Sequence, residues 1–166
     1  MTNDHAAAPE ARRSKQPSTQ TQRDFVSIVI GDQLFGIPVL QVQDVLGPQR
    51  ITRIPLAPPE VAGSLNLRGR IVTAIDIRTR LGLPELGDGK KRMSIVVDLG
   101  GELYSLMVDS VGEVLSLGEA AFERNPATLD QRWREVSAGI YRLDGQLLVV
   151  LDVARLLNLS AHSQAA

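Results

Sequence analysis

The sequence predicts a mainly β protein built from two similar halves. First, GDQLFGIPVLQVQDVL from Gly31 reappears as GGELYSLMVDSVGEVL from Gly100, with six of sixteen positions identical. Second, LRGRIVTAIDIRTRLGL from Leu67 aligns without a gap on LDGQLLVVLDVARLLNL from Leu143. Third, short apolar runs that end at turn residues recur in both halves. About ten short strands in two groups of five therefore predict two small β-barrels packed together, with short helical segments.

The first half opens with a predicted hairpin. The β-rich run Phe25–Ile30 ends at the turn signal Gly31-Asp32, and the apolar segment LFGI follows from Leu34. Pro38 fixes one backbone dihedral and predicts a tight turn or a single helical turn after this hairpin.

A third strand follows this turn. Val42, Asp44 and Leu46 alternate with other residues at a period of two, so they should share one face of a strand. Three prolines within residues 51–59 then predict an extended loop or edge without full ladder bonding.

The first half closes with a second predicted hairpin. Val61–Leu67 is a strand, Arg68-Gly69 a turn, and Ile71–Ile77 a nearly continuous apolar strand that should be buried on both faces. Asp76–Leu81 predicts a short helical turn.

The second half repeats this plan. Its predicted strands are Met93–Leu99, Leu103–Val108, Val111–Leu115 and Leu147–Leu151. Gly100-Gly101 forms a turn, and a longer insertion, Glu119–Val136, holds the single tryptophan, Trp133, and should be partly helical. Asp152–Asn158 predicts a terminal helical turn.

Composition excludes several classes of function. Eighteen basic and 19 acidic residues leave no overall field to attract nucleic acid or an anionic membrane. The chain has no cysteine, and both histidines, His5 and His162, lie near the termini. We therefore expect no thiol chemistry, no metal site and no cofactor.

The ends of the chain are predicted to be disordered tails, residues 1–23 and 160–166, because they hold too few apolar residues to offset the entropy of ordering. Between them we expect one domain, residues 24–159, with lobe 1 at about 24–84 and lobe 2 at about 92–159. The sequence has no signal-peptide core and no apolar run of about 18 residues, which predicts a cytoplasmic protein without membrane insertion.

Several motifs together resemble the CheW family of bacterial chemotaxis coupling proteins. They are NLRG at Asn66 with the apolar strand after it, Gly36-Ile37 leading to VQDV at Val42, and Val108-Asp109 leading to Val111 and Val114. The resemblance covers about residues 25–159. It implies a non-enzymatic, SH3-like two-barrel adapter that links methyl-accepting chemotaxis receptors to the regulatory domain of the CheA histidine kinase. Such an adapter is a monomer alone, forms rings or arrays with the kinase, and is recruited to membrane receptor arrays through its partners.

The resemblance also implies site residues. The residues at positions that match the family's receptor-binding groove, where the tip of a receptor hairpin would bind, are Val42, Asp44, Gly63, Arg68, Val111 and Val114. Gly139 and Met93 are expected at a kinase or receptor interface. Many family members have Glu at the position of Asp44, so the reach here is one methylene shorter.

Each of these residues also has a local interpretation. Arg68 is an interface arginine or a turn residue that bridges to Asp44 or to a backbone carbonyl for local order, and both interpretations hold if an Arg68–Asp44 pair shapes the groove. Val42 is a contact or a core residue. Asp76 and Asp152 occupy equivalent places, and capping of the following helical turn explains them better than catalysis does.

Three other functions stay open on the sequence alone. A paralogue could serve a different array, for surface motility or second-messenger control. A small hydrolase could use Asp76, Asp109 or Asp152, and would need paired carboxylates with perturbed pKa values in a concave pocket. A regulator could bind its partner through the N-terminal tail.

Overall fold

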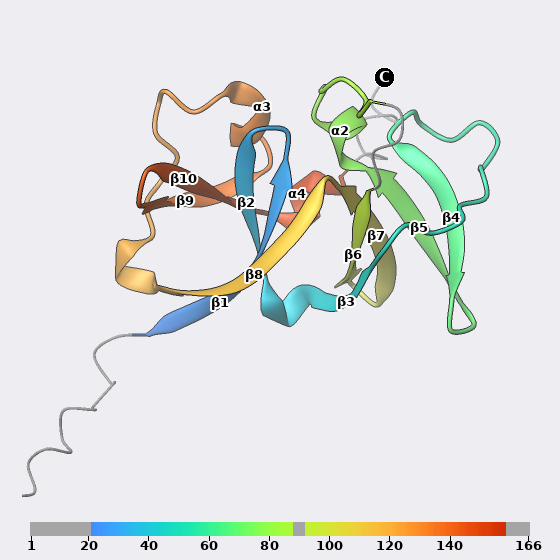
Figure 1. Cartoon of the computed structure of the whole chain (residues 1–166), viewed down its shortest axis with the longest axis horizontal. Helices are drawn as coiled ribbons and strands as arrows, with labels where there is room; N and C mark the ends of the chain where they lie inside the picture. The colour runs from blue at the N-terminus through green and yellow to red at the C-terminus, as the bar shows by residue number, and fades with distance from the viewer. Residues whose placement is uncertain (1–20, 88–91, 159–166) are drawn as a thin grey trace, which may run out of the picture.

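The computed structural model describes residues 21–87 and 92–158, and it confirms a mainly β fold with two five-stranded sheets and a few short helices (Figure 1). The first sheet has the order β8-β1-β2-β10-β9, with bounds Ser110–Gly118, Gln22–Ile30, Gln33–Pro38, Gln146–Leu151 and Ser137–Leu143. The second sheet has the order β3-β6-β7-β5-β4, with bounds Val42–Leu46, Met93–Leu99, Glu102–Val108, Arg70–Asp76 and Val61–Leu67. Each sheet has one parallel pair, β2 with β10 and β5 with β7, among antiparallel ones.

The two sheets do not follow the two halves of the sequence. By the repeat, β1 to β5 correspond to β6 to β10, but the β1–β2 hairpin pairs with β8 and β10 of the second half. In the same way, β6 and β7 pair with β3 and β5 of the first half. The predicted lobes, 24–84 and 92–159, are therefore wrong as structural units. The physical reason is that Pro38 and the single turn η2 (Val39–Gln41) carry the chain out of the first sheet instead of reversing it beside β2.

The chain crosses between the sheets twice. It leaves the first sheet through η2 and returns at Asp109, which lies between β7 and β8. Each sheet is thus completed by a hairpin from the other half, and the two crossings occupy corresponding places in the repeat, with Leu40 opposite Asp109.

The largest core lies between the two sheets. It combines residues of both, for example Ile28 and Val149 of the first sheet with Ile95 and Leu106 of the second. Two smaller clusters, each of four buried residues, lie within single sheets. One surrounds Phe25 in the first sheet, and the other surrounds Leu65 in the second. Burial of this shared apolar surface holds the two sheets as one unit.

The short helical elements agree with the sequence where capping residues are present. The helices are α2 (Ile77–Arg80), η3 (Glu119–Ala121), α3 (Gln131–Arg134) and α4 (Val153–Leu156). Asp76 caps α2 and Asp152 caps α4, each accepting a backbone N–H three residues on, so the capping prediction is confirmed. In α3, Trp133 packs edge-on against Phe35 of β2. No helix among the described residues is long and apolar enough to span a bilayer.

Two further predictions need correction. Ile71 is 70 % exposed, so the apolar strand β5 is buried on both faces only beyond its first residues. The predicted tail 1–23 overlaps β1, which begins at Gln22 and pairs with the end of β8. Residues 1–20 and 160–166 lie outside the described residues.

Candidate docking surface

Two edge strands, one from each sheet, carry the centre of the candidate site. In the repeat, Val42 of β3 corresponds to Val111 of β8, and Val45 corresponds to Val114. Val42 and Val111 are half-buried and pack against the core between the sheets. Val45 and Val114 are 41 % and 59 % exposed. The two halves therefore present the same pair of valines, one inner and one outer, at two sheet edges.

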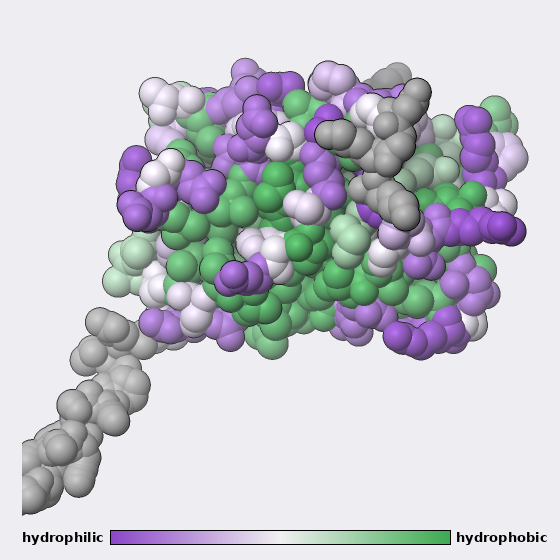
Figure 2. Space-filling model, in the orientation of Figure 1, coloured by the Kyte–Doolittle hydropathy of each residue, from purple (hydrophilic) through white to green (hydrophobic). Residues whose placement is uncertain are grey.

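The two edges approach each other around β6. This strand pairs with β3 and also contacts β8 and η2. Leu40 of η2 is 95 % exposed. Figure 2 shows apolar residues gathered over the region where β8, η2 and β3 lie in Figure 1. We call this set the docking surface: Leu40, Val42, Val45, Val111 and Val114. Exposed apolar residues that gather on one face are typical of sites of protein contact.

A shallow pocket borders the docking surface. It has a volume of about 260 Å³ and lies between the start of β1 and η2; its lining residues are Gln22, Arg23, Asp24, Pro38, Val39 and Leu40. The lining combines proline and aliphatic side chains from the end of β2 and from η2 with charged and amide side chains from β1. Apolar contact with a polar rim is the usual composition of a protein interface.

Asp44 and Arg68 form an ion pair that joins opposite edges of the second sheet. Arg68 lies in the turn after β4, and its Nη2 is 2.9 Å from Oδ2 of Asp44 on β3. That oxygen has no aligned hydrogen-bond donor, so the contact is an ion pair without a directed hydrogen bond. The Arg68 side chain is 76 % exposed, whereas that of Asp44 is 22 % exposed. The predicted bridge is confirmed, and its arginine remains available to a partner.

Arg68 also has an unusual backbone. Its φ is 51°, and the Asn66 side chain accepts a hydrogen bond from the Gly69 N–H at 2.9 Å, which stabilises the turn. A left-handed conformation is uncommon for a residue with a long side chain. The turn therefore holds the start of the Arg68 side chain in a fixed direction, toward Asp44.

Gly63 of β4 and Gly139 of β9 are outside the five residues of the docking surface, and their contacts indicate a structural role. They are equivalent positions, with φ values of 150° and 155°, and both are buried. A Cβ at Gly63 would collide with the Thr52 carbonyl oxygen, and one at Gly139 with the Phe122 ring. The residue after each glycine forms an isolated β-bridge with an incoming loop. Ser64 pairs with Thr52, and Ile140 pairs with Glu123. Both glycines thus permit a close approach of two backbones.

Met93 begins β6 and is half-buried. It packs against the core between the sheets, so the structure places it beside the core and not among the exposed apolar residues. Of the eight residues predicted for sites, the docking surface and its ion pair bring together five: Val42, Asp44, Arg68, Val111 and Val114.

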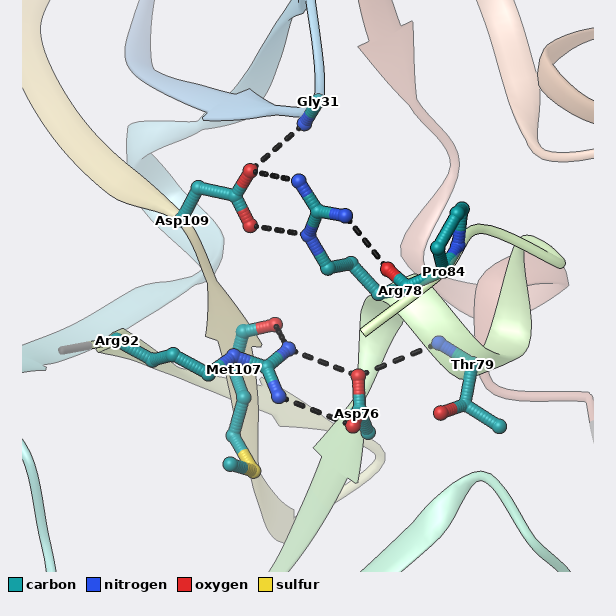
Figure 3. Close-up of polar contacts among 8 residues, drawn as sticks. All are labelled: Gly31, Asp76, Arg78, Thr79, Pro84, Arg92, Met107 and Asp109. Carbon is teal, nitrogen blue, oxygen red and sulfur yellow. Dashed lines mark hydrogen bonds and ion pairs between the residues drawn. The ribbon is translucent and has the colours of Figure 1, made fainter. Parts of the chain in front are cut away.

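Asp109 lies at a junction of three elements (Figure 3). Arg78 of α2 donates from Nε to Oδ1 at 2.8 Å and from Nη2 to Oδ2 at 2.7 Å. The Gly31 N–H in the β1–β2 turn donates to Oδ2 at 2.8 Å. Partial burial raises the pKa of Asp109, but the hydrogen bonds from Arg78 and Gly31 outweigh it and hold the pKa below 3.8.

Asp76 forms a second two-point ion pair close by. Arg92 donates from Nη1 to Oδ2 at 3.0 Å and from Nη2 to Oδ1 at 2.8 Å, and its Nη2 also donates to the Met107 carbonyl at 3.3 Å. Burial raises the pKa of Asp76, while Arg92 and the Thr79 N–H lower it to a net value below 3.8. Asp76 lies 16 residues before Arg92 in the sequence, so this ion pair depends on the folded sheet.

The lowered pKa values of Asp76 and Asp109 argue against the general acid that the hydrolase alternative needs. A catalytic acid at neutral pH needs a raised pKa, whereas the pKa values of Asp76 and Asp109 are lowered by their own arginines. Asp152 caps α4 and lies 3.6 Å from Arg155. Within residues 21–87 and 92–158, no group of three or more His, Asp or Glu side chains is placed to hold a metal ion. The geometry supports a binding surface and gives no support to the hydrolase alternative.

Sequence reasoning missed Leu40 and Val45 at the docking surface. The repeat offered a signal for Val45, because it aligns with Val114, which was predicted. Leu40 aligns with an aspartate, so its exposure could be found only from the fold.

An apolar docking surface beside an exposed ion pair, here on a two-sheet β fold, is typical of proteins that bind other proteins. The comparisons agree. The model of the CheW-like domain family matches residues 24–161, and the chain therefore belongs to the CheW family of chemotaxis scaffold proteins.

Relatives cover most of the chain. The chemotaxis protein CheW of Klebsiella aerogenes is 29% identical over 145 residues, which is 87% of each chain. That of Helicobacter pylori is 27% identical over 145 residues, again 87% of each. The crystal structure of the scaffolding protein TtCheW from Thermoanaerobacter tengcongensis is similar with a TM-score of 0.71 and 29% identity, covering 79% of this chain and 89% of that one.

Proposed function

We propose that this protein is a non-enzymatic adapter that couples methyl-accepting chemotaxis receptors to a CheA-type histidine kinase in cytoplasmic signalling arrays. The observation that carries the proposal is the docking surface, in which equivalent valines of β3 and β8 flank the exposed Leu40. Membership of the CheW family supplies the class of partner.

The receptor hairpin tip contacts the docking surface. The hairpin is a pair of helices, and such helices bind through a stripe of apolar side chains. The two inner valines and Leu40 offer apolar contacts to this stripe. Asp44 and Arg68 lie at the rim, where the partly free Arg68 guanidinium offers donors to a carbonyl or carboxylate of the hairpin.

The kinase regulatory domain binds separately from the hairpin. Its contact must leave the docking surface open, because an adapter has to hold both partners at once. The sheets offer edges for this purpose, since β4 and β9 lie at the ends opposite β3 and β8.

The experiment is a ternary binding test with purified protein. An immobilised receptor cytoplasmic hairpin is exposed to the adapter, then to the kinase regulatory domain, and the kinase domain should be retained only when the adapter is present. Each partner is also tested alone against the adapter. Retention of one partner that excludes the other would contradict coupling, and binding of neither would remove the adapter proposal.

A further inference from the structure

The second crossing between the sheets is held by a side chain. Asp109 directly precedes β8, the strand that carries Val111 and Val114. Its backbone N–H donates to the Val29 carbonyl of β1 at 3.1 Å, and its carboxylate accepts from the Gly31 N–H. These contacts fix the start of β8 to the β1–β2 hairpin of the first sheet.

The same carboxylate reaches the second sheet. Arg78 belongs to α2, which directly follows β5, and it binds both oxygens of Asp109 (Figure 3). Arg78 Nη1 also donates to the Pro84 carbonyl at 2.6 Å, which anchors the chain after α2. Only 13 % of the Arg78 side chain and 16 % of the Asp109 side chain are exposed, so solvent screens the pair weakly.

A second ion pair, between Asp76 and Arg92, stabilises the position of Arg78. Asp76 caps α2, the helix that carries Arg78, and Arg92 ties Asp76 to the Met107 carbonyl at the end of β7. The ends of β5 and β7 and the start of β6 therefore hold Arg78 at a fixed distance from the crossing at Asp109.

The first crossing has no such lock. Leu40 occupies the corresponding place, and an aliphatic side chain that is 95 % exposed holds no hydrogen bond or ion pair. One crossing thus contributes an apolar contact residue to the docking surface, and the other fixes the position of the strand opposite.

We propose that Asp109 is a positioning residue for the docking surface: through Arg78 and Gly31 it holds β8 against the second sheet, so that Val111 and Val114 keep their place relative to Val42. The proposal rests on the proposed function for its consequence in binding. The positioning itself can be measured without a partner.

The first measurement is methyl NMR of the full chain with labelled valines. In Asp109→Ala, the signals of Val111 and Val114 should shift, while those of Val72 and Val150, in the separate clusters of the two sheets, should stay. Glu123→Gln is the matched control, because it opens an exposed ion pair with Arg142 in the first sheet and should leave all four signals unchanged.

The second measurement is the affinity of a receptor cytoplasmic hairpin for the same variants. Asp109→Ala should weaken binding about tenfold, because a displaced β8 would let Val111 and Val114 fit the hairpin less closely. Asp109→Glu, which keeps the charge and lengthens the side chain, should retain most of the affinity. Loss of affinity without any shift at Val111 and Val114 would overturn the proposal, as would a shift with full affinity.

Two situations need separate readouts. If Asp109→Ala does not fold, Arg78→Gln replaces it, because this variant removes the two-point contact and leaves the Gly31 hydrogen bond; the same shifts are then required. If wild-type protein fails to bind the hairpin while Val111 and Val114 still shift in the variant, the proposed function is wrong and the positioning role is supported. Unchanged valine signals overturn the inference whatever the binding result.

Discussion

Val42 and Val111 occupy the same position of the internal repeat, and both lie half-buried at the margin of the core between the sheets. Because the hairpins are exchanged between the halves, these two valines stand on edge strands of different sheets. The duplication thus generates one shared surface from two equivalent edges. The ion pair between Asp44 and Arg68 distinguishes the β3 edge from the β8 edge. In the repeat, Asp44 corresponds to Glu113 and Arg68 to Asp144, and two acidic residues cannot form this ion pair.

Substitution of Gly63 should destabilise the fold strongly. In Gly63→Ala the new methyl group collides with the Thr52 carbonyl oxygen and the backbone must keep φ at 150°. We expect a loss of roughly 2–4 kcal/mol in the free energy of unfolding, measured by urea denaturation. Gly47→Ala is the control, because nothing lies within 4 Å of a Cβ there. Equal stability of the two variants would contradict the close-approach role of Gly63.

Arg68→Ala should separate binding from folding. The Arg68 side chain is largely exposed, so loss of its ion pair should change the free energy of unfolding by less than about 1 kcal/mol. Binding of the receptor hairpin should weaken by roughly 1 to 3 kcal/mol, as for an interface hot spot. Arg142→Ala, which breaks a similarly exposed ion pair, should leave binding unchanged. An unfolded Arg68→Ala protein would assign the residue to local order alone.

Acid should destabilise the protein through Asp76 and Asp109. Because the pKa values of both carboxyls are lowered in the folded state, the unfolded chain takes up protons first as the pH falls. Their stabilisation is complete above the unfolded value near 3.8 and is lost as the pH falls through the folded values. Urea titrations between about pH 6 and pH 3 should show falling stability in the wild type. The decline should be shallower in Asp109→Asn, and equal slopes would contradict the assignment.

The two equivalent helix caps should differ in strength. Asp152→Ala removes the cap of α4 and a loose contact with Arg155, so we expect a loss of about 1 kcal/mol. Asp76→Ala removes the cap of α2 and also leaves the partly buried Arg92 without its anion, for a loss of roughly 2–3 kcal/mol. Thermal unfolding of both variants tests this order. A larger effect at Asp152 would show that the Arg92 contact contributes little.

Local patterns in the sequence predicted most single elements of the fold. Period-two alternation predicted the strand β3, and the carboxylates before α2 and α4 predicted their caps. The prediction that Val42, Asp44 and Leu46 share one face is wrong, because a bulge lies between Val42 and Asp44, and Val42 and Leu46 pack against different clusters. β9 was not predicted, although the offset of 76 residues maps β4 (Val61–Leu67) onto Ser137–Leu143, the bounds of β9.

Pairing between distant segments could not be predicted from the same patterns. Strands of the two halves carry similar side chains, so composition does not decide whether the edge of β1 that faces away from β2 pairs within its own half or with β8. The contacts of Arg78 and Arg92 depend on that pairing, because their carboxylate partners are 31 and 16 residues away. For the same reason the exposure of Leu40 follows from the crossing and not from its neighbours in sequence.

The most direct test of receptor binding at the docking surface is the affinity of the receptor hairpin for Val42→Met, measured by calorimetry. The affinity of the same variant for the kinase regulatory domain is measured in parallel. The longer side chain enlarges the inner position of the docking surface, so hairpin binding should be lost while kinase binding persists. Leu56→Met is the control, because Leu56 is a fully exposed loop residue outside the docking surface. Unchanged hairpin affinity in a folded Val42→Met protein would contradict the placement of receptor binding at this surface.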